Sequence, residues 1–240
     1  MEIIITKNYG ALSDTAARFI AAQLLLKPES VLGLATGSSP LGTYEVLAGG
    51  QNDVDFSRAR TVNLDEYCGL AGDDPRSYRF FMDAHLFSKV NIRKEHTHIP
   101  DGRAADADKE CARYEALLRD LGGVDVQLLG IGNNGHIGFN EPSDAFEVAT
   151  HKQPLSASTI AANKRFFERE EDVPRFAYTM GIGTIMRARR ILLIASGAAK
   201  AAALKQALTG PVTPALPASV LRLHAAVTVI ADADAAALLQ

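Results

Sequence analysis

The chain alternates between short runs that are apolar at nearly every position and longer segments in which apolar residues recur with a helical period. The short runs are rich in β-branched residues, and continuous apolarity of this kind is typical of strands that are covered on both faces. The predicted strands are residues 3–5, 31–34, 61–64, 124–129, 191–195 and 227–230.

The segments between these runs predict helices. Residues 11–26 place Leu12, Ala16 and Ile20 on one stripe, and residues 103–121 show the same period. Strands that alternate with helices predict an α/β fold, which we expect to be a three-layer, Rossmann-like sandwich with a mainly parallel central sheet. We expect one domain over residues 1–240. Two shorter helices are predicted at residues 41–47 and 198–208.

The composition changes most sharply at residues 163–174, where charged residues mix with Phe166 and Phe167. A solvated helix that two aromatic side chains anchor is the favoured interpretation. A mobile lid over residues 155–175, covering a pocket, is the alternative.

Charge and cysteine content narrow the classes of partner. The 240 residues include 25 Lys and Arg against 28 Asp and Glu, and this balance of −3 favours neither nucleic acid nor an anionic membrane as the main partner. Two cysteines exclude a disulfide framework and a Cys-x-x-Cys metal site. The N-terminus lacks the features of a signal peptide, and no apolar run is long enough to span a membrane. We therefore expect a cytoplasmic protein.

Ligands of α/β sheets bind beyond the carboxyl ends of the strands, so the loops after the strands are the places to search for chemistry. After residues 31–34 come Thr36, Gly37, Ser38 and Ser39, and then Pro40 in the first turn of a predicted helix. Ser38 or Ser39 suits the N-cap. Hydroxyl donors at a helix N-terminus make an anion site, although an ordinary capped turn explains this segment equally well.

The loop after residues 61–64 begins with Asp65 and Glu66. A carboxylate at the end of a strand is well placed for acid–base chemistry, and because successive side chains point in opposite directions only one of the pair is expected to face a ligand. A helix cap or a surface acidic pair is the commoner role for an isolated Asp-Glu.

The loop after residues 124–129 reads GIGNNGHIGFNEP and matches G-x-G-x-x-G in its first six positions. A dinucleotide site requires a helix to open at the third glycine, and Gly138 and Pro142 would interrupt such a helix, so we reject that interpretation. The loop presents His136 and Glu141, with Asn134 as a neutral donor and acceptor. A carboxylate near an imidazole can orient it for proton transfer near neutral pH.

Two cations are candidates for binding an anion, although only the position of Lys200 argues for it. Lys200 comes after the strand at residues 191–195 and lies in the first turn of the next predicted helix, where a positive charge opposes the helix dipole. This placement indicates an anion nearby. Arg165 has simple surface charge as its alternative role.

Taken together, the stretches LGLATGSSPLGTY, NLDEY, LLGIGNNGHIGFNEP, ANKRF, ASGAAK and PASVLRLH resemble the glucosamine-6-phosphate deaminase (isomerase) family over most of the chain. GHIGFNEP is the most specific of them. The related 6-phosphogluconolactonases have a Gly-His loop without the Phe-Asn-Glu-Pro run and are the second candidate.

The resemblance implies an enzyme that converts glucosamine 6-phosphate and water to fructose 6-phosphate and ammonia without a metal or an organic cofactor. By motif, Asp65 corresponds to the base that enolises the sugar, and His136 with Glu141 to a relay that opens the sugar ring. Asn134 stands where many family members carry Asp.

The same resemblance implies the binding residues and the mode of regulation. It assigns the substrate phosphate to Thr36, Gly37, Ser38, Ser39, Arg165 and Lys200. Larger family members are hexamers activated by N-acetylglucosamine 6-phosphate, but His151 and Gln153 occupy positions where their basic effector ligands are expected. We therefore expect hyperbolic kinetics, with a monomer favoured over a homo-oligomer.

Overall fold

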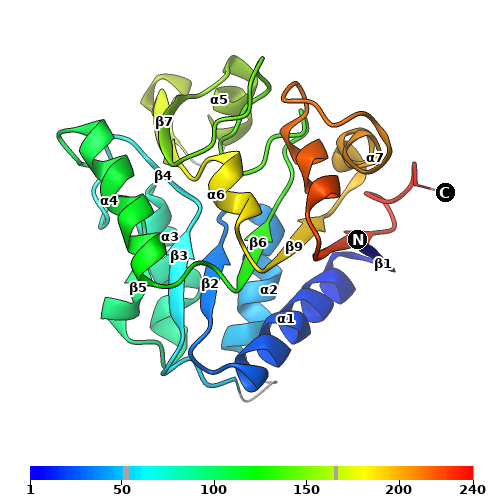
Figure 1. The fold of residues 1–240 in the computed structure, drawn as a ribbon, viewed down its shortest axis with the longest axis horizontal. Helices are drawn as coiled ribbons and strands as arrows, with labels where there is room; N and C mark the ends of the chain where they lie inside the picture. The colour runs from blue at the N-terminus through cyan, green and yellow to red at the C-terminus, as the bar shows by residue number, and fades with distance from the viewer. Residues whose placement is uncertain (51–53, 165–166, 240) are drawn as a thin grey trace.

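Seven parallel strands form the central sheet of the computed structural model, which describes residues 1–50, 54–164 and 167–239 (Figure 1). Their order across the sheet is β1–β10–β9–β6–β2–β3–β5. All six predicted strands are present, and the fold class is confirmed. The strands are β1 (Glu2–Thr6), β2 (Val31–Leu34), β3 (Arg60–Asn63), β5 (Thr97–His98), β6 (Val126–Leu129), β9 (Arg190–Ala195) and β10 (Val227–Asp232).

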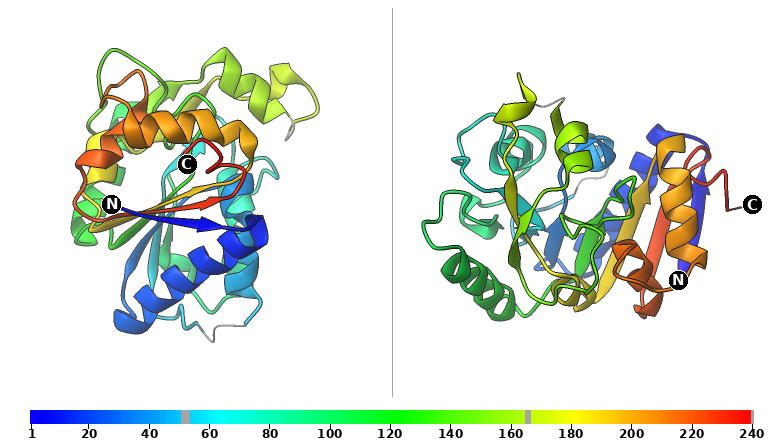
Figure 2. Two further views of the ribbon diagram at one scale, coloured as in Figure 1. Left: turned by 90° about the vertical axis from the view of Figure 1, so that its right-hand side faces the viewer. Right: turned by 90° about the horizontal axis from the view of Figure 1, so that it is seen from above.

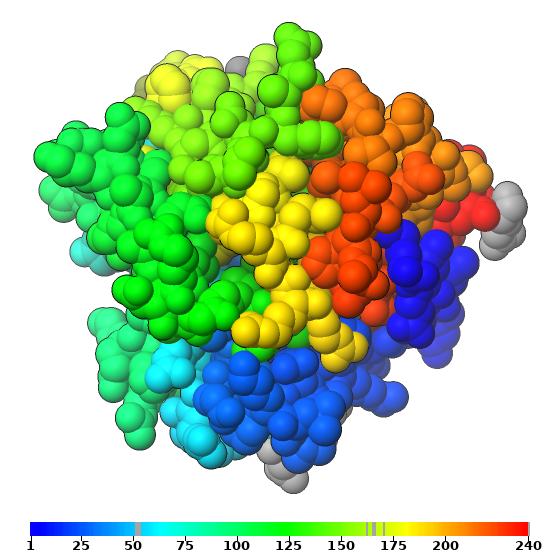
Figure 3. Space-filling model, viewed as in Figure 1, coloured from blue at the N-terminus to red at the C-terminus, as the bar shows by residue number. Residues whose placement is uncertain are grey.

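Helices cover both faces of this sheet and make the three predicted layers (Figure 2). One face packs on α1 (Tyr9–Leu26), α2 (Ser38–Ala48) and α3 (Tyr78–His85). The other face packs on α4 (Ala107–Asp120), α6 (Ile182–Met186) and α7 (Ala201–Thr209). Figure 3 shows α4, α6 and the 3₁₀ turn at Pro217–Leu223 closing over this second face. Coverage on both sides explains why β2 and β6 are buried at every position.

Two predicted helices begin later than the apolar period suggested. The helix predicted at residues 103–121 begins at Ala107, because the Asp106 side chain accepts the N–H of Lys109 at 3.1 Å and caps the helix there. The helix predicted at residues 198–208 opens with a 3₁₀ turn at Ala198–Lys200 before α7 begins.

A second, antiparallel sheet in the order β4–β8–β7 lies beside the first. Its strands are β4 (Asp65–Tyr67), β7 (His151–Pro154) and β8 (Phe176–Thr179). The helix α5 (Ala157–Asn163) comes after β7, and both lie at the top of the molecule in Figure 1. A separate apolar cluster packs this part of the molecule and contains Tyr67, Phe139, Leu155, Ile160, Phe167 and Val173.

The helix predicted at residues 163–174 is not present in the described part of that segment, because α5 ends at Asn163 and a 3₁₀ turn at Glu170–Asp172 follows instead of an α-helix. Phe167 is buried, as the predicted anchoring requires, whereas Phe166 lies outside the described residues. The lid itself stays a prediction.

The order of strands reverses at one point of the main sheet. From β2 the chain proceeds through β3 to β5 at one edge, and from β6 it proceeds through β9 to β10 toward the other. The crevice between the carboxyl ends of β2 and β6 is therefore the switch point at which open α/β sheets bind ligands.

Candidate active site

A cavity of about 530 Å³ opens at this crevice. It is lined by the loops after β2, β3, β6 and β9, so side chains far apart in sequence meet there. Arg165 lies outside the described residues. The other predicted site residues on the cavity wall are Thr36, Gly37, Ser38, Ser39, Asp65, Asn134, His136 and Lys200.

The anion loop corrects one expectation about capping. Neither Ser38 nor Ser39 is the N-cap of α2, because the helix begins at Ser38 and Gly37 occupies the cap position. Gly37 has a φ of 96°, a left-handed conformation that glycine adopts without strain. This turn places both serines within the first helical turn, on the cavity wall, where the helix dipole is positive.

Hydrogen bonds with the last strand, β10, hold the turn that carries Lys200. Asp232 at the end of β10 accepts the Ser196 hydroxyl at 2.5 Å and the Gly197 N–H at 3.0 Å. Sequence reasoning missed Asp232, because no local motif connects it to residues 36 positions earlier.

Asp65 lies where the chain passes from one sheet to the other. Leu64 donates its N–H to Leu34 in the main sheet and accepts the N–H of Met180, so the strand changes partners at this point. The Asp65 side chain lines the cavity although the residue is only 6% exposed. Burial, together with the neighbouring charge of Glu66, raises the pKa of Asp65 to about 8.

Glu66 has a structural position instead. Its Oε1 accepts the N–H groups of Tyr67 at 2.8 Å and Tyr78 at 2.9 Å, and its Oε2 accepts the N–H of Arg79 at 2.9 Å. The carboxylate therefore caps the N-terminus of α3. Of the acidic pair only Asp65 lines the cavity, as the alternation of side chains predicted.

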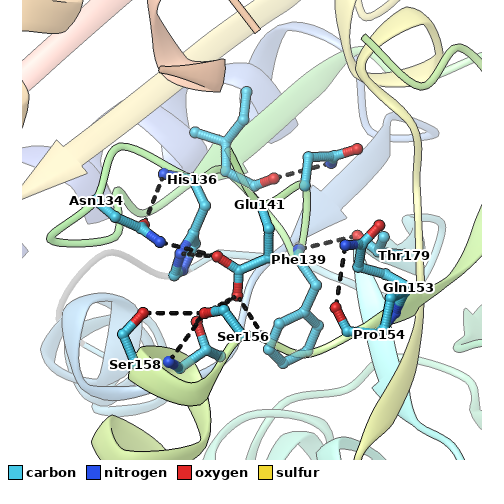
Figure 4. A network of polar contacts seen from close by, with 12 residues as sticks. Asn134, His136, Phe139, Glu141, Gln153, Pro154, Ser156, Ser158 and Thr179 are labelled. Atoms are coloured by element: carbon cyan, nitrogen blue, oxygen red, sulfur yellow. Dashed lines mark hydrogen bonds and ion pairs between the residues drawn. The ribbon is translucent and has the colours of Figure 1, made fainter. Parts of the chain in front are cut away.

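The carboxylate of Glu141 lies behind the cavity wall and accepts several hydrogen bonds there (Figure 4). Its Oε2 accepts the side-chain N–H of Asn134 at 2.8 Å and lies 3.7 Å from Nδ1 of His136. Burial acts to raise the pKa of Glu141, but contacts with His136, Thr159 and Asn134 outweigh it and lower the pKa to about 2. The carboxylate is thus ionised beside the imidazole, whose side chain is 23% exposed.

The structure adds cavity residues that the sequence did not indicate. Tyr78 and Phe139 stack with ring centroids 6.0 Å apart and form an aromatic wall. Arg76 lines the mouth and pairs with Asp74 at 2.6 Å. Ser158, Thr159 and Asn163 come from α5, so part of the predicted lid segment does lie against the cavity.

Metal-ligating side chains are dispersed in the described part of the chain. Within residues 1–50, 54–164 and 167–239, no three His, Cys, Asp or Glu side chains are grouped so that they could hold a metal ion. No helix in the same residues is long and apolar enough to cross a membrane.

The main sheet is doubly wound, and the cavity at its switch point combines a buried carboxylic acid, an imidazole, a lysine and a helix N-terminus. These features define the class of protein, an α/β enzyme for a small anionic substrate. The chain belongs to the glucosamine-6-phosphate isomerase/6-phosphogluconolactonase family, whose sequence model matches residues 8–230.

Two similar relatives are both deaminases rather than lactonases. The chain is 55% identical over 232 residues to the glucosamine-6-phosphate deaminase of Lachnoclostridium phytofermentans, and the match covers 96% of this chain and 98% of that protein. The deaminase of Clostridium perfringens is 49% identical over the full length of both.

Among solved structures, a deaminase is more similar to this chain than a lactonase is. A monomeric glucosamine-6-phosphate deaminase superposes with a TM-score of 0.97 at 46% identity, covering 99% of this chain and 100% of that one. The 6-phosphogluconolactonase of Trypanosoma cruzi shares the fold, with a TM-score of 0.81 at 20% identity over 100% of this chain and 97% of that one.

Proposed function

We propose that this chain is an isomerising deaminase that converts glucosamine 6-phosphate and water to fructose 6-phosphate and ammonia, a step of amino-sugar catabolism. One observation carries the proposal: Asp65 and His136, with Glu141 behind it, meet at one cavity with Lys200 and the N-terminus of α2. The identity of about half of all residues with full-length deaminases supports it independently.

Binding begins at the phosphate. The helix N-terminus and the hydroxyls of Thr36, Ser38 and Ser39 supply hydrogen-bond donors, and Lys200 supplies a point charge. Arg165 adds a guanidinium fork in this proposal, on the strength of its sequence motif alone. These contacts hold a part of the sugar that does not react, so their binding energy orients the reacting carbons.

The pyranose ring must open before the chemistry at C2. His136 takes the proton of the anomeric hydroxyl and returns one to the ring oxygen, which gives a C1 aldehyde. Ionised Glu141 lies 3.7 Å from Nδ1, so its negative charge favours a protonated Nδ1 and keeps the imidazole in the useful orientation.

Asp65 then acts as the base. It removes the proton on C2, which the C1 aldehyde acidifies, and the electrons form an enolamine. Protonation at C1 gives an iminium group at C2, water adds to it, and ammonia leaves to produce the ketose.

A direct assay tests the function. Purified protein should release ammonia from glucosamine 6-phosphate in the presence of a chelator. It should not accelerate the hydrolysis of 6-phosphogluconolactone above the spontaneous rate. Enzymatic loss of the lactone without ammonia release would assign the chain to the other branch of the family.

The pH dependence is set by Asp65. A base must be deprotonated, and its pKa in the free enzyme is raised to about 8, so the active fraction grows as the pH increases. We expect kcat/KM to increase with pH up to about 8 and then to level off. Initial rates at low substrate concentration across this range measure the effect, and a profile that is flat below neutral pH would contradict it.

Replacing Lys200 should weaken binding more than catalysis. Lys200→Met removes the point charge but keeps much of the aliphatic side chain, and we expect KM to rise roughly tenfold while kcat changes little. Steady-state kinetics with glucosamine 6-phosphate measure both constants. An unchanged KM would remove Lys200 from the phosphate site.

We further propose a monomeric, cytoplasmic enzyme with hyperbolic kinetics. The similar solved deaminase is described as monomeric. At the positions of the expected effector ligands, His151 and Gln153 hydrogen bond to one another at 3.1 Å. The free thiols of Cys68 and Cys111 suit a reducing compartment. Sigmoidal saturation that N-acetylglucosamine 6-phosphate relieves would contradict the kinetic part of this proposal, and light scattering tests the mass.

A further inference from the structure

The two oxygens of Glu141 are held from different parts of the chain. Oε2 faces Asn134 and His136, which belong to the same loop as Glu141 itself. Oε1 accepts hydrogen bonds from the hydroxyls of Thr159 and Ser156, both of which come with α5. The orientation of the carboxylate toward the imidazole therefore depends on a helix that is remote in sequence.

Thr159 is the better placed of the two hydroxyls. It is 5% exposed and Glu141 is 8% exposed, so little water competes for the carboxylate. Ser156 is the N-cap of α5 and its hydroxyl also accepts the N–H of Thr159 at 3.2 Å. This cap fixes the first turn of the helix, and with it the direction in which the Thr159 hydroxyl points.

We propose that Thr159 is a positioning residue for the reaction, which holds Glu141 in the orientation that directs His136 at the sugar ring. This inference rests on the proposed function, because it assigns Thr159 a task within ring opening. It makes α5 a part of the catalytic apparatus as well as a wall of the cavity: an α5 displaced from its place would leave Glu141 with Asn134 and His136 alone.

The test compares Thr159→Val with Thr159→Ser in the full-length protein. Valine keeps the shape of the side chain and loses the hydroxyl, and we expect kcat to fall about fivefold with little change in KM. The Thr159 hydroxyl is one of the contacts that lower the pKa of Glu141. Its loss should raise that pKa, but the pH profile is set by Asp65 and should keep its position. A loss of kcat at unchanged KM and unchanged pH profile is the expected signature, and serine should restore kcat.

Thr184→Val is the matched control. Thr184 of α6 donates to Glu115 of α4 at 2.5 Å, in a buried pair that does not line the cavity. This variant should unfold at a lower temperature and keep the kcat of the unmodified enzyme. If Thr159→Val also kept that kcat, or if serine failed to restore it, the inference would be wrong.

Two further outcomes are distinguishable. If valine at position 159 prevents folding, Thr159→Ala is compared with Thr159→Ser by the same measurements. Failure of the unmodified protein to release ammonia would instead overturn the proposed function, and that result is read before any variant is assayed.

Discussion

Replacing Asp65 with Asn is expected to abolish ammonia release while sugar-phosphate binding stays nearly intact. The amide has almost the same shape as the carboxylate but cannot accept the proton on C2, and loss of a general base typically costs about 10²–10⁴-fold in rate. The proposed phosphate contacts lie at other positions of the cavity, so calorimetric titration with glucosamine 6-phosphate should give an affinity close to that of the unmodified enzyme.

The fold should tolerate this substitution. The pKa of Asp65 in the folded protein is raised above that of an unfolded aspartate, so deprotonation costs stability as the pH rises toward 8. A neutral amide removes that cost, and we expect Asp65→Asn to unfold at the same temperature as the unmodified protein or at a higher one. Parallel losses of binding and turnover would refute the role of Asp65 as the base.

The adjacent carboxylate provides a contrasting control. Glu66 uses both oxygens to accept N–H groups at the start of α3. Glu66→Gln has only one acceptor oxygen for them, so we expect a lower unfolding temperature with turnover retained. The two variants would then show that Asp65 is the acid that reacts and that Glu66 is the acid that stabilises the fold.

The two sheets differ in how well the sequence predicted their strands. Six of the seven strands of the main sheet were predicted, because burial on both faces produces a continuous apolar run, as in β2 and β9. β5 was missed, because it has only two residues, Thr97 and His98. The strands of the second sheet were not predicted. β4 has three residues, all with polar groups, and β7 alternates between half-buried and exposed positions, so neither has the apolar run that marks a buried strand.

The same limit applies to the cavity. Residues in the loops directly after predicted strands, such as Asp65 and His136, could be named because a parallel sheet brings its carboxyl ends together. Thr159 and Tyr78 could not, because α5 and α3 reach the cavity through the second sheet and the Glu66 cap, which are contacts between remote segments. Asp232 was missed for the same reason.

A glycine beneath the imidazole gives the second large effect. A Cβ added at Gly132 would lie 2.4 Å from Nδ1 and Cε1 of His136, a distance at which the ring has to move. We expect Gly132→Ala to lower kcat roughly a hundredfold, because a displacement of about 1 Å in a reacting group has a cost of that order. Stability should change little, since a side chain can yield more easily than the backbone.

Gly130 in the same loop is the matched control, because a Cβ there would meet only Ser39, at an ordinary contact distance of 3.7 Å. Gly130→Ala should therefore retain most of the activity that Gly132→Ala loses, and both variants should unfold at similar temperatures. Equal kcat values for the two would mean that the imidazole position is not what limits turnover. A large loss confined to position 132 would instead tie catalysis to the place where the loop holds the His136 ring.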